Sequence, residues 1–110
     1  MMTFKKYFAN IFGGISMTNA PNKNENMTVH LRVKDYNTWR TGYDGNEKSR
    51  LSAGITNGRV FRSVEDPNDL VILQDAADVT KARSWLGSDD MKTTMQKSGV
   101  IGSPTICFAA

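Results

Sequence analysis

Cysteine and histidine are almost absent from this chain, which has one of each among its 110 residues. A single cysteine excludes an internal disulfide and any metal site built from several cysteines. That residue, Cys107, lies in a strand-like apolar run, so we expect it to be a small buried side chain rather than a reactive thiol. Long hydrophobic runs are also missing, and none approaches the roughly 20 residues that a membrane-spanning helix needs.

Excess charge of one sign is small as well. The net charge is +3, and residues 1–26 contribute +2 of it, because Lys5, Lys6 and Lys23 stand there against Glu25. Over residues 27–110 acidic and basic residues are interleaved, and no basic stripe appears. A duplex-binding domain needs such a stripe, so we expect no nucleic-acid partner.

Signature patterns of common enzyme classes are missing too. The chain has no glycine-rich phosphate loop, no metal-ligand spacing and no nucleophilic serine signature. We therefore expect no bound cofactor or metal. The composition, 39% hydrophobic and 23% charged, is that of an ordinary globular protein, and we expect a cytoplasmic one. A chain this short buries only a modest core, so pairing with a second copy would help it.

Residues 1–26 differ from the rest and are predicted to form an N-terminal extension, with an amphipathic segment followed by a polar linker, before a domain at 27–110. Aromatic and aliphatic residues recur there at helical spacing until Gly13, and residues 18–26 read TNAPNKNEN. Three interpretations stay open: an extension before a later start at Met17 or Met27, a docking or membrane-surface helix, and a secretory signal.

The domain begins with an alternating pattern typical of a half-buried strand at residues 28–34, TVHLRVK. Asp35 follows at a helix N-cap position. Aromatic residues at three- and four-residue spacing, Tyr36, Trp39 and Tyr43, then predict one helix to about residue 52. Gly54 would end it in a left-handed conformation. Gly42 and Gly45 weaken the middle of this helix.

The second half of the domain predicts three more strands and two more helices. Strands are expected at 58–64 and 70–75, joined by the turn-forming residues 65–69, and a final strand at 105–110. The strand at 70–75 is apolar at each position from Leu70 to Leu73, which is typical of burial on both faces. Helices begin at Asp78 and Ser88.

The element order is therefore β-α-β-β-α-β, and its two halves resemble each other. Asp35 and Arg40 after the first strand match Asp78 and Arg83 after the third. A repeated βαβ unit predicts the α+β ferredoxin-like fold, a four-stranded antiparallel sheet with its helices on one face. The other sheet face would be left bare although it carries large apolar residues. We expect a second copy to cover it, giving a homodimeric α/β barrel with a cavity between the sheets.

Residues 27–110 resemble the dimeric α/β-barrel superfamily, which includes antibiotic-biosynthesis-monooxygenase-like proteins and small proteins called cyclases. The stretches that carry the resemblance are VHLRVKDYNTW, NGRVFRSVEDPNDLVIL, DVTKARSWLGSDDMKTTMQKSGV and GSPTICF. The resemblance implies the fold, and its activities range from cofactor-free oxygenation to haem degradation and proteins of no known reaction.

Candidate site residues follow from the predicted bare face. His30 and Arg32 lie two positions apart on it, and as a proton acceptor and an oxyanion partner they are our candidate catalytic residues. Candidate ligand-binding residues are Trp39, Phe61, Arg62 and Phe108. The function we expect is that of a homodimer whose inter-sheet cavity takes a small apolar or aromatic molecule, and the resemblance implies a cofactor-independent monooxygenase or cyclase-like activity on it. The alternative is a non-catalytic ligand-binding or stress-associated dimer.

Overall fold

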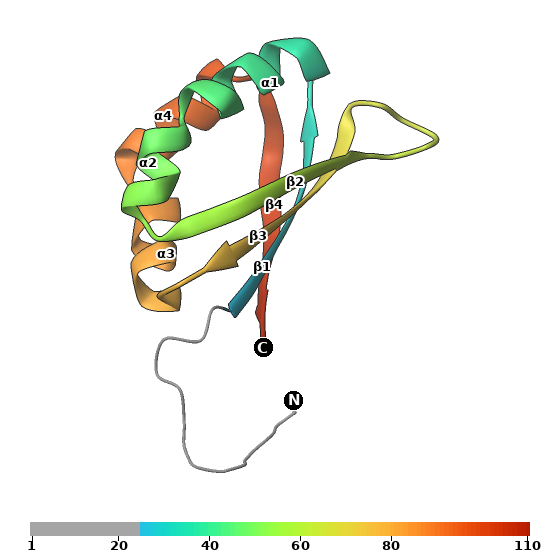
Figure 1. The fold of residues 1–110 in the computed structure, drawn as a ribbon. Helices are drawn as coiled ribbons and strands as arrows, with labels where there is room; N and C mark the ends of the chain where they lie inside the picture. Colours follow the sequence, from blue (N-terminus) through green and yellow to red (C-terminus); the bar gives the residue numbers. More distant parts are fainter. Residues whose placement is uncertain (1–24) are drawn as a thin grey trace, which may run out of the picture.

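The computed structural model of the chain describes residues 25–110 (Figure 1). The predicted extension therefore lies outside the described residues, except for Glu25 and Asn26, which belong to the first strand. The strands are β1 (Glu25–Val33), β2 (Ile55–Arg62), β3 (Asp69–Ala76) and β4 (Val100–Ala109). The helices are α1 (Tyr36–Gly45), α2 (Glu47–Ser52), α3 (Val79–Leu86) and α4 (Asp89–Lys97).

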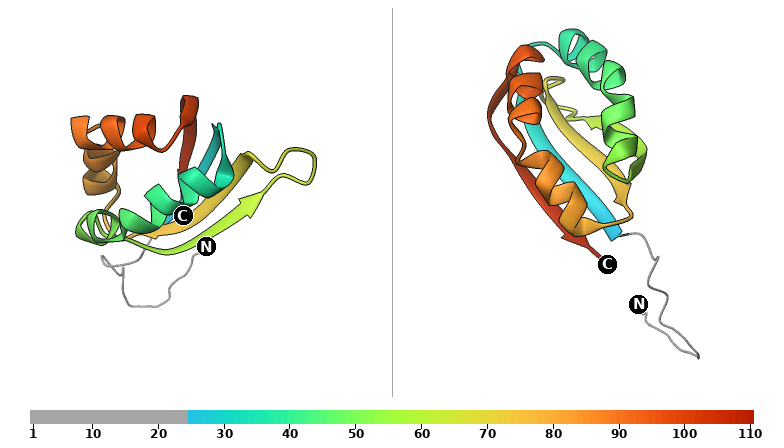
Figure 2. Two further views of the ribbon diagram at one scale, coloured as in Figure 1. Left: turned by 90° about the horizontal axis from the view of Figure 1, so that it is seen from above. Right: turned by 90° about the vertical axis from the view of Figure 1, so that its left-hand side faces the viewer.

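The four strands form one antiparallel sheet in the order β2-β3-β1-β4. Figure 2 shows the helices as two pairs on the same face of this sheet, α1–α2 and α3–α4. The predicted α+β ferredoxin-like fold is thereby confirmed for the single chain. Among residues 25–110, no helix is long and apolar enough to cross a membrane.

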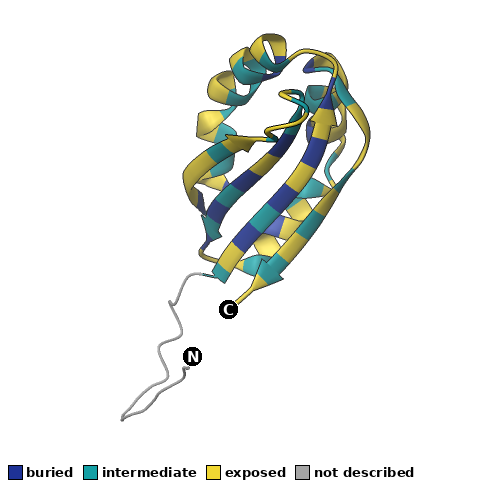
Figure 3. Cartoon of the chain, turned by 90° about the vertical axis from the view of Figure 1, so that its right-hand side faces the viewer, coloured by how far each residue is buried: buried dark blue, intermediate teal, exposed yellow. Residues whose placement is uncertain are grey.

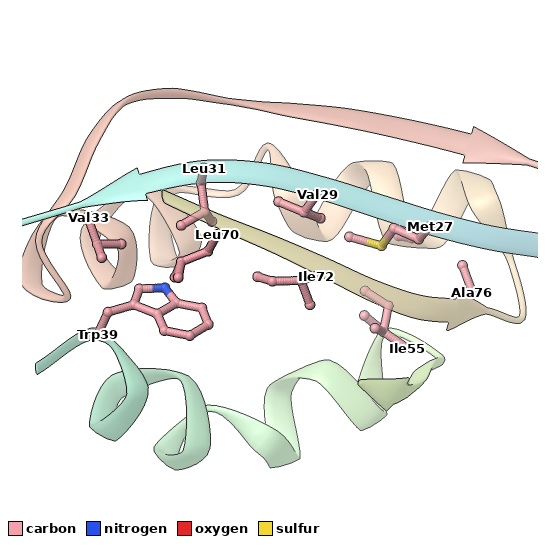
Figure 4. Close-up of a cluster of buried hydrophobic side chains, with 11 residues drawn as sticks. Met27, Val29, Leu31, Val33, Trp39, Ile55, Leu70, Ile72 and Ala76 are labelled. Carbon is pink, nitrogen blue, oxygen red and sulfur yellow. The ribbon is translucent and has the colours of Figure 1, made fainter. Parts of the chain in front are cut away.

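Alternation along β1 and β3 produces the core. Every second residue of both strands is buried toward the helices, and the residues between them lie on the opposite face (Figure 3). Figure 4 shows the indole of Trp39 lying between the helix layer and the side chains of Leu70 and Leu31. The buried core residues of the two strands are Met27, Val29, Leu31, Val33, Leu70, Ile72 and Ala76.

The predicted helix starts are confirmed by their caps. The side chains of Asp35, Asp78 and Ser88 each accept a hydrogen bond from the backbone N–H three residues later. The single helix predicted up to residue 52 is wrong, because α1 ends at Gly45 and α2 begins at Glu47. The backbone N–H of Asn46 donates to the backbone oxygen of Tyr43, three residues earlier, which is the spacing of a 3₁₀ turn rather than an α-helix. This tighter turn follows Gly45, which already weakens the helix.

Two burial predictions are also wrong. The third strand is not buried on both faces, since Val71 is exposed while Leu70 and Ile72 are buried. Cys107 is exposed rather than buried. It lies opposite Thr28, on the sheet face that the helices leave free. The apolar residues on either side of Cys107 therefore predicted a strand correctly, but they did not show on which face of the sheet Cys107 lies.

Strand boundaries differ from the predicted ones because of local backbone geometry. β4 begins at Val100, five residues before the predicted strand, and passes through Gly102 and Pro104. It is an edge strand, where proline is tolerated. Gly102 has a φ of +68°, and the pairing register with β1 shifts between His30 and Arg32. The unusual residues thus bend this strand without ending it.

Leucine-to-alanine substitutions at a buried and an exposed site test where the core lies. Leu70 is 0% exposed and Leu51 on α2 is 53% exposed. We expect Leu70→Ala to lower the free energy of unfolding by about 2–5 kcal/mol, because it removes buried surface and leaves a cavity. Leu51→Ala should change it by less than about 1 kcal/mol. Urea unfolding followed by circular dichroism measures both values, and equal losses would contradict this core.

Candidate functional site

The open sheet face, which we define as the face away from the helices, carries the two predicted catalytic residues. His30 and Arg32 both lie on it. His30 Nε2 is 2.7 Å from Asp69 Oδ1 of β3, and the Nη2 atom of Arg32 donates to Asp66 Oδ2 at 3.0 Å. A carboxylate only accepts, so the Nε2 atom of His30 carries the shared proton and Nδ1 is left for another group. Each predicted catalytic residue is thus held by an acidic residue of its own chain.

Apolar side chains surround this pair of polar residues on the open face. Val71 lies directly opposite His30 in the sheet, and Phe61 lies opposite Val71 on the far side. Phe61 is 48% exposed and Ile101 of β4 is 49% exposed. Arg59 places its guanidinium 6.0 Å from the centre of the Phe61 ring. The open face is therefore a mixed surface with a substantial uncovered apolar part.

The other three predicted ligand-binding residues lie on the helix side. Trp39 is buried, and Phe108 packs against the core with the guanidinium of Arg83 4.9 Å from its ring. Arg62 stacks over the ring of Tyr36 at 3.8 Å and donates to the backbone oxygen of Pro67. The structure thus brings His30, Arg32 and Phe61 to one face, and the remaining three to the other.

A pocket between the helices and the sheet was not anticipated from the sequence. Its cavity is about 70 Å³. Apolar residues of β1, β3 and β4 form its floor, and residues of all four helices form its walls. The lining includes Trp39, Trp85, Leu86, Met91, Met95 and Ile106.

Three contacts join the two helix pairs above this pocket. Trp85 Nε1 donates to Ser49 Oγ at 2.7 Å, and Asn46 Nδ2 donates to Met91 Sδ at 3.4 Å. At the third contact α1 comes so close to the end of α4 that a Cβ on Gly42 would lie 2.5 Å from the hydroxyl oxygen of Ser98. We call this line of contacts the helix seam.

The pocket has a polar end at Tyr43 and Gln74. Gln74 Nε2 donates to Tyr43 Oη at 2.8 Å. The guanidinium of Arg50 lies 3.7 Å from the centre of the Tyr43 ring. In the sequence, Gln74 continues the buried row of Leu70 and Ile72 at a spacing of two residues. This polar residue at a core position is the only feature of the sequence that could have indicated the polar end of the pocket, because a buried polar side chain needs a hydrogen-bond partner.

Metal ligation has little support in the described part of the chain. Nowhere in residues 25–110 do three or more histidine, cysteine, aspartate or glutamate side chains come together. The polar groups at the Tyr43–Gln74 end of the pocket are instead a phenol, a carboxamide and a guanidinium, which are suited to hydrogen bonding an organic molecule.

Comparison with known proteins identifies the fold through solved structures alone. No protein-family model and no curated protein sequence matches the chain. An inferred antibiotic biosynthesis monooxygenase of Bordetella bronchiseptica is 14% identical, with a TM-score of 0.64, over 80% of this chain and 97% of that one. SnoaB of Streptomyces nogalater, a cofactor-independent oxygenase, is 10% identical, with a TM-score of 0.60, over 79% of this chain and 93% of that one.

A conserved protein of Methanosarcina mazei is similar to the same degree, with 15% identity and a TM-score of 0.59 over 80% of this chain and 92% of that one. At such low identities the likeness establishes the fold and leaves the reaction open. The chain has the ferredoxin-like fold of antibiotic-biosynthesis-monooxygenase-like proteins, as the sequence resemblance predicted.

Asp35 holds the helix that carries Trp39 and Tyr43 into the pocket, and its protonation is expected to weaken that helix. The backbone N–H of Thr38, and then its hydroxyl group, lower the pKa of Asp35 by donating to the carboxylate. Because the folded pKa is the lower one, the stabilisation is present above the unfolded pKa and is lost as pH falls through the folded value. Asparagine caps helices without titrating.

We therefore expect Asp35→Asn to be less stable than wild type at pH 7, with a difference that shrinks as the pH falls below about 4, the ordinary range of an aspartate. Thermal melting between pH 7 and pH 3 measures it. Thr38→Val removes one of the two donors and should reduce the pH dependence. A difference that stays constant over this range would contradict the role of the Asp35 charge.

Proposed function

We propose that this protein is a homodimer that binds a small apolar or aromatic molecule, and that the ligand occupies the pocket between the helices and the sheet. The observation that carries this proposal is the apolar cavity of about 70 Å³, which both tryptophans of the chain line and which has one polar end. Small-molecule sites commonly combine an apolar lining with a few placed polar groups. A cavity between two facing sheets, as predicted from the sequence, would exist only in the dimer.

The size of the cavity limits the class of ligand. Its volume corresponds to about two water molecules at roughly 30 Å³ each, and a cavity of about 150 Å³ is known to hold benzene. A single aromatic ring therefore needs the two helix pairs to separate slightly along the helix seam. Ligands larger than one or two rings would need a larger movement. We accordingly expect single-ring compounds to bind best.

A second candidate function is oxygenation of the bound molecule without a cofactor. The likeness in fold to SnoaB, described as a cofactor-independent oxygenase, favours it. In this candidate the molecule binds instead between the open faces of a dimer, where His30 and Arg32 act as proton acceptor and oxyanion partner and Phe61 forms a wall. Trp39, Arg62 and Phe108 lie on the helix side of the sheet and take no part in it. Oxygen consumption that depends on ligand and is lost in His30→Ala would distinguish an enzyme from a binding protein. The cytoplasmic location stays a prediction.

Ligand binding is tested with toluene as the probe and two matched variants of β4. Ile106 lines the pocket, whereas Ile101 lies on the open face of the same strand. At ten times its dissociation constant, toluene should stabilise the wild-type protein by about 1.4 kcal/mol. We expect Ile106→Trp to abolish this stabilisation by filling the pocket, and Ile101→Trp to keep it. Thermal melting with and without toluene measures the effect.

The outcomes of this experiment are distinct. Loss of toluene stabilisation in Ile106→Trp alone supports the pocket as the binding site. The same loss in both variants, or no stabilisation of the wild-type protein, would overturn it. Sedimentation of both variants shows whether the open-face substitution has also changed the oligomeric state, and circular dichroism shows whether each variant is folded.

Dimerisation through the open face is tested with a charge placed at its centre. Val71 is 37% exposed beside His30, and Val64 in the loop between β2 and β3 is fully exposed. We expect a dimer at micromolar concentration for the wild-type protein and for Val64→Lys. Val71→Lys should give a monomer, because a buried ammonium without a partner is unfavourable in an interface. Sedimentation velocity measures the mass, and a monomeric wild-type protein would contradict the proposed dimer.

A further inference from the structure

Gln74 has an unused hydrogen-bonding atom inside the molecule. The residue is only 6% exposed, and its Nε2 atom donates to Tyr43 Oη at 2.8 Å. Its other polar atom, the carbonyl oxygen Oε1, has no hydrogen-bond partner among residues 25–110. Buried polar atoms without a partner are unfavourable and uncommon. An acceptor is therefore available at the end of the pocket.

The hydroxyl group of Tyr43 supplies the complementary donor. Its oxygen accepts from Gln74, so its own proton can be donated to a further group, and none accepts it within the described residues. Arg50 fixes the orientation of the ring, because its guanidinium stacks on the ring and donates to the backbone oxygen of Tyr43. The pocket therefore ends in one acceptor, Gln74 Oε1, beside two donors, the hydroxyl group of Tyr43 and the second N–H of Gln74 Nε2.

An irregularity in β2 leaves space for the side chains of Tyr43 and Gln74. Asn57 and Gly58 lie between the register pairs Thr56–Asp75 and Arg59–Leu73, where the pairing with β3 shifts. A Cβ on Gly58 would lie 2.3 Å from Tyr43 Oη and 3.6 Å from Gln74 Nε2. Only a residue without a side chain lets the hydroxyl group approach so closely. Irregularities of this kind commonly redirect side chains beside functional sites.

The same pair also lines a second hollow. A groove of about 320 Å³ lies beside α1, α2 and β2. Three residues line both this groove and the inner pocket, namely Tyr43, Arg50 and Gln74. A molecule that enters from the groove would meet these polar groups first and leave its apolar part in the cavity.

We propose that Tyr43 and Gln74 are specificity-determining residues that select a hydroxylated single-ring aromatic compound. A phenolic hydroxyl group matches both free atoms, since its oxygen accepts from Tyr43 and its proton is donated to Gln74 Oε1. This inference rests on the proposed ligand pocket. It adds the chemical class of the ligand and the residues that recognise it.

Phenol and toluene test this selection, because they differ only in a hydroxyl or a methyl group on the same ring. Trp39 and Trp85, the only tryptophans of the chain, both line the pocket, so their fluorescence reports binding of either probe. The measured quantity is the ratio of the dissociation constants for toluene and phenol. We expect Tyr43→Phe and Gln74→Leu each to lower this ratio about 3- to 10-fold, the effect of one lost hydrogen bond.

Two further variants control for indirect effects. Tyr36→Phe makes the same change on a tyrosine of α1 that does not line the pocket, and it should leave the ratio unchanged. Gly58→Ala keeps both Tyr43 and Gln74 but moves the hydroxyl group, so it should lower the ratio as Tyr43→Phe does. Circular dichroism and thermal melting establish that each variant is folded.

The outcomes separate this inference from the proposed function. If the wild-type protein binds neither probe, both the pocket and this inference are overturned. If toluene and phenol bind the wild-type protein but the ratio is the same in Tyr43→Phe, Gln74→Leu and Gly58→Ala, the pocket stands and the selection by Tyr43 and Gln74 is overturned. A fall in the ratio confined to these three variants supports it.

Discussion

Burial of one face of β1 and β3 is the constraint on which the rest of this structure depends. Successive side chains of a strand point to opposite faces, so these two central strands send every second residue into a single apolar layer. Both helix pairs must lie over that layer to remove it from water. The same geometry places the intervening residues, including His30 and Val71, on a face that the helices of residues 25–110 do not cover. The two-residue alternation of β1 and β3 therefore produces both the buried core and the open face.

The pocket exists because two short helix pairs, rather than one continuous layer, cover the sheet. They meet along the helix seam, through one hydroxyl acceptor, one thioether acceptor and one close approach at a glycine. Sulfur is a weak acceptor, so this contact gives way more easily than the strand pairing below it. Separation of the helix pairs would enlarge the cavity without breaking the sheet. Strand pairing thus holds the floor of the pocket, whereas a few side-chain contacts hold the two helix pairs together above it.

Sequence patterns predicted the fold well because alternation and helix caps are local signals. The caps at Asp35, Asp78 and Ser88 and the placement of His30 on the open face required only neighbouring residues. The faces of Arg62 and Phe108 depend on how β2 and β4 are paired, which no local pattern determines. Gln74 illustrates the same limit, since its partner Tyr43 is 31 positions away in the chain. Contacts of that kind decide where a pocket and its polar groups lie.

The close approach of Tyr43 to Gly58 has a consequence for how this protein can change over evolution. No side chain fits at position 58 while the hydroxyl group of Tyr43 keeps its present position, whereas phenylalanine at position 43 would free the space. The effect of a substitution at one position therefore depends on the residue at the other. Loss of the hydroxyl group at position 43 would therefore make a side chain at position 58 less costly.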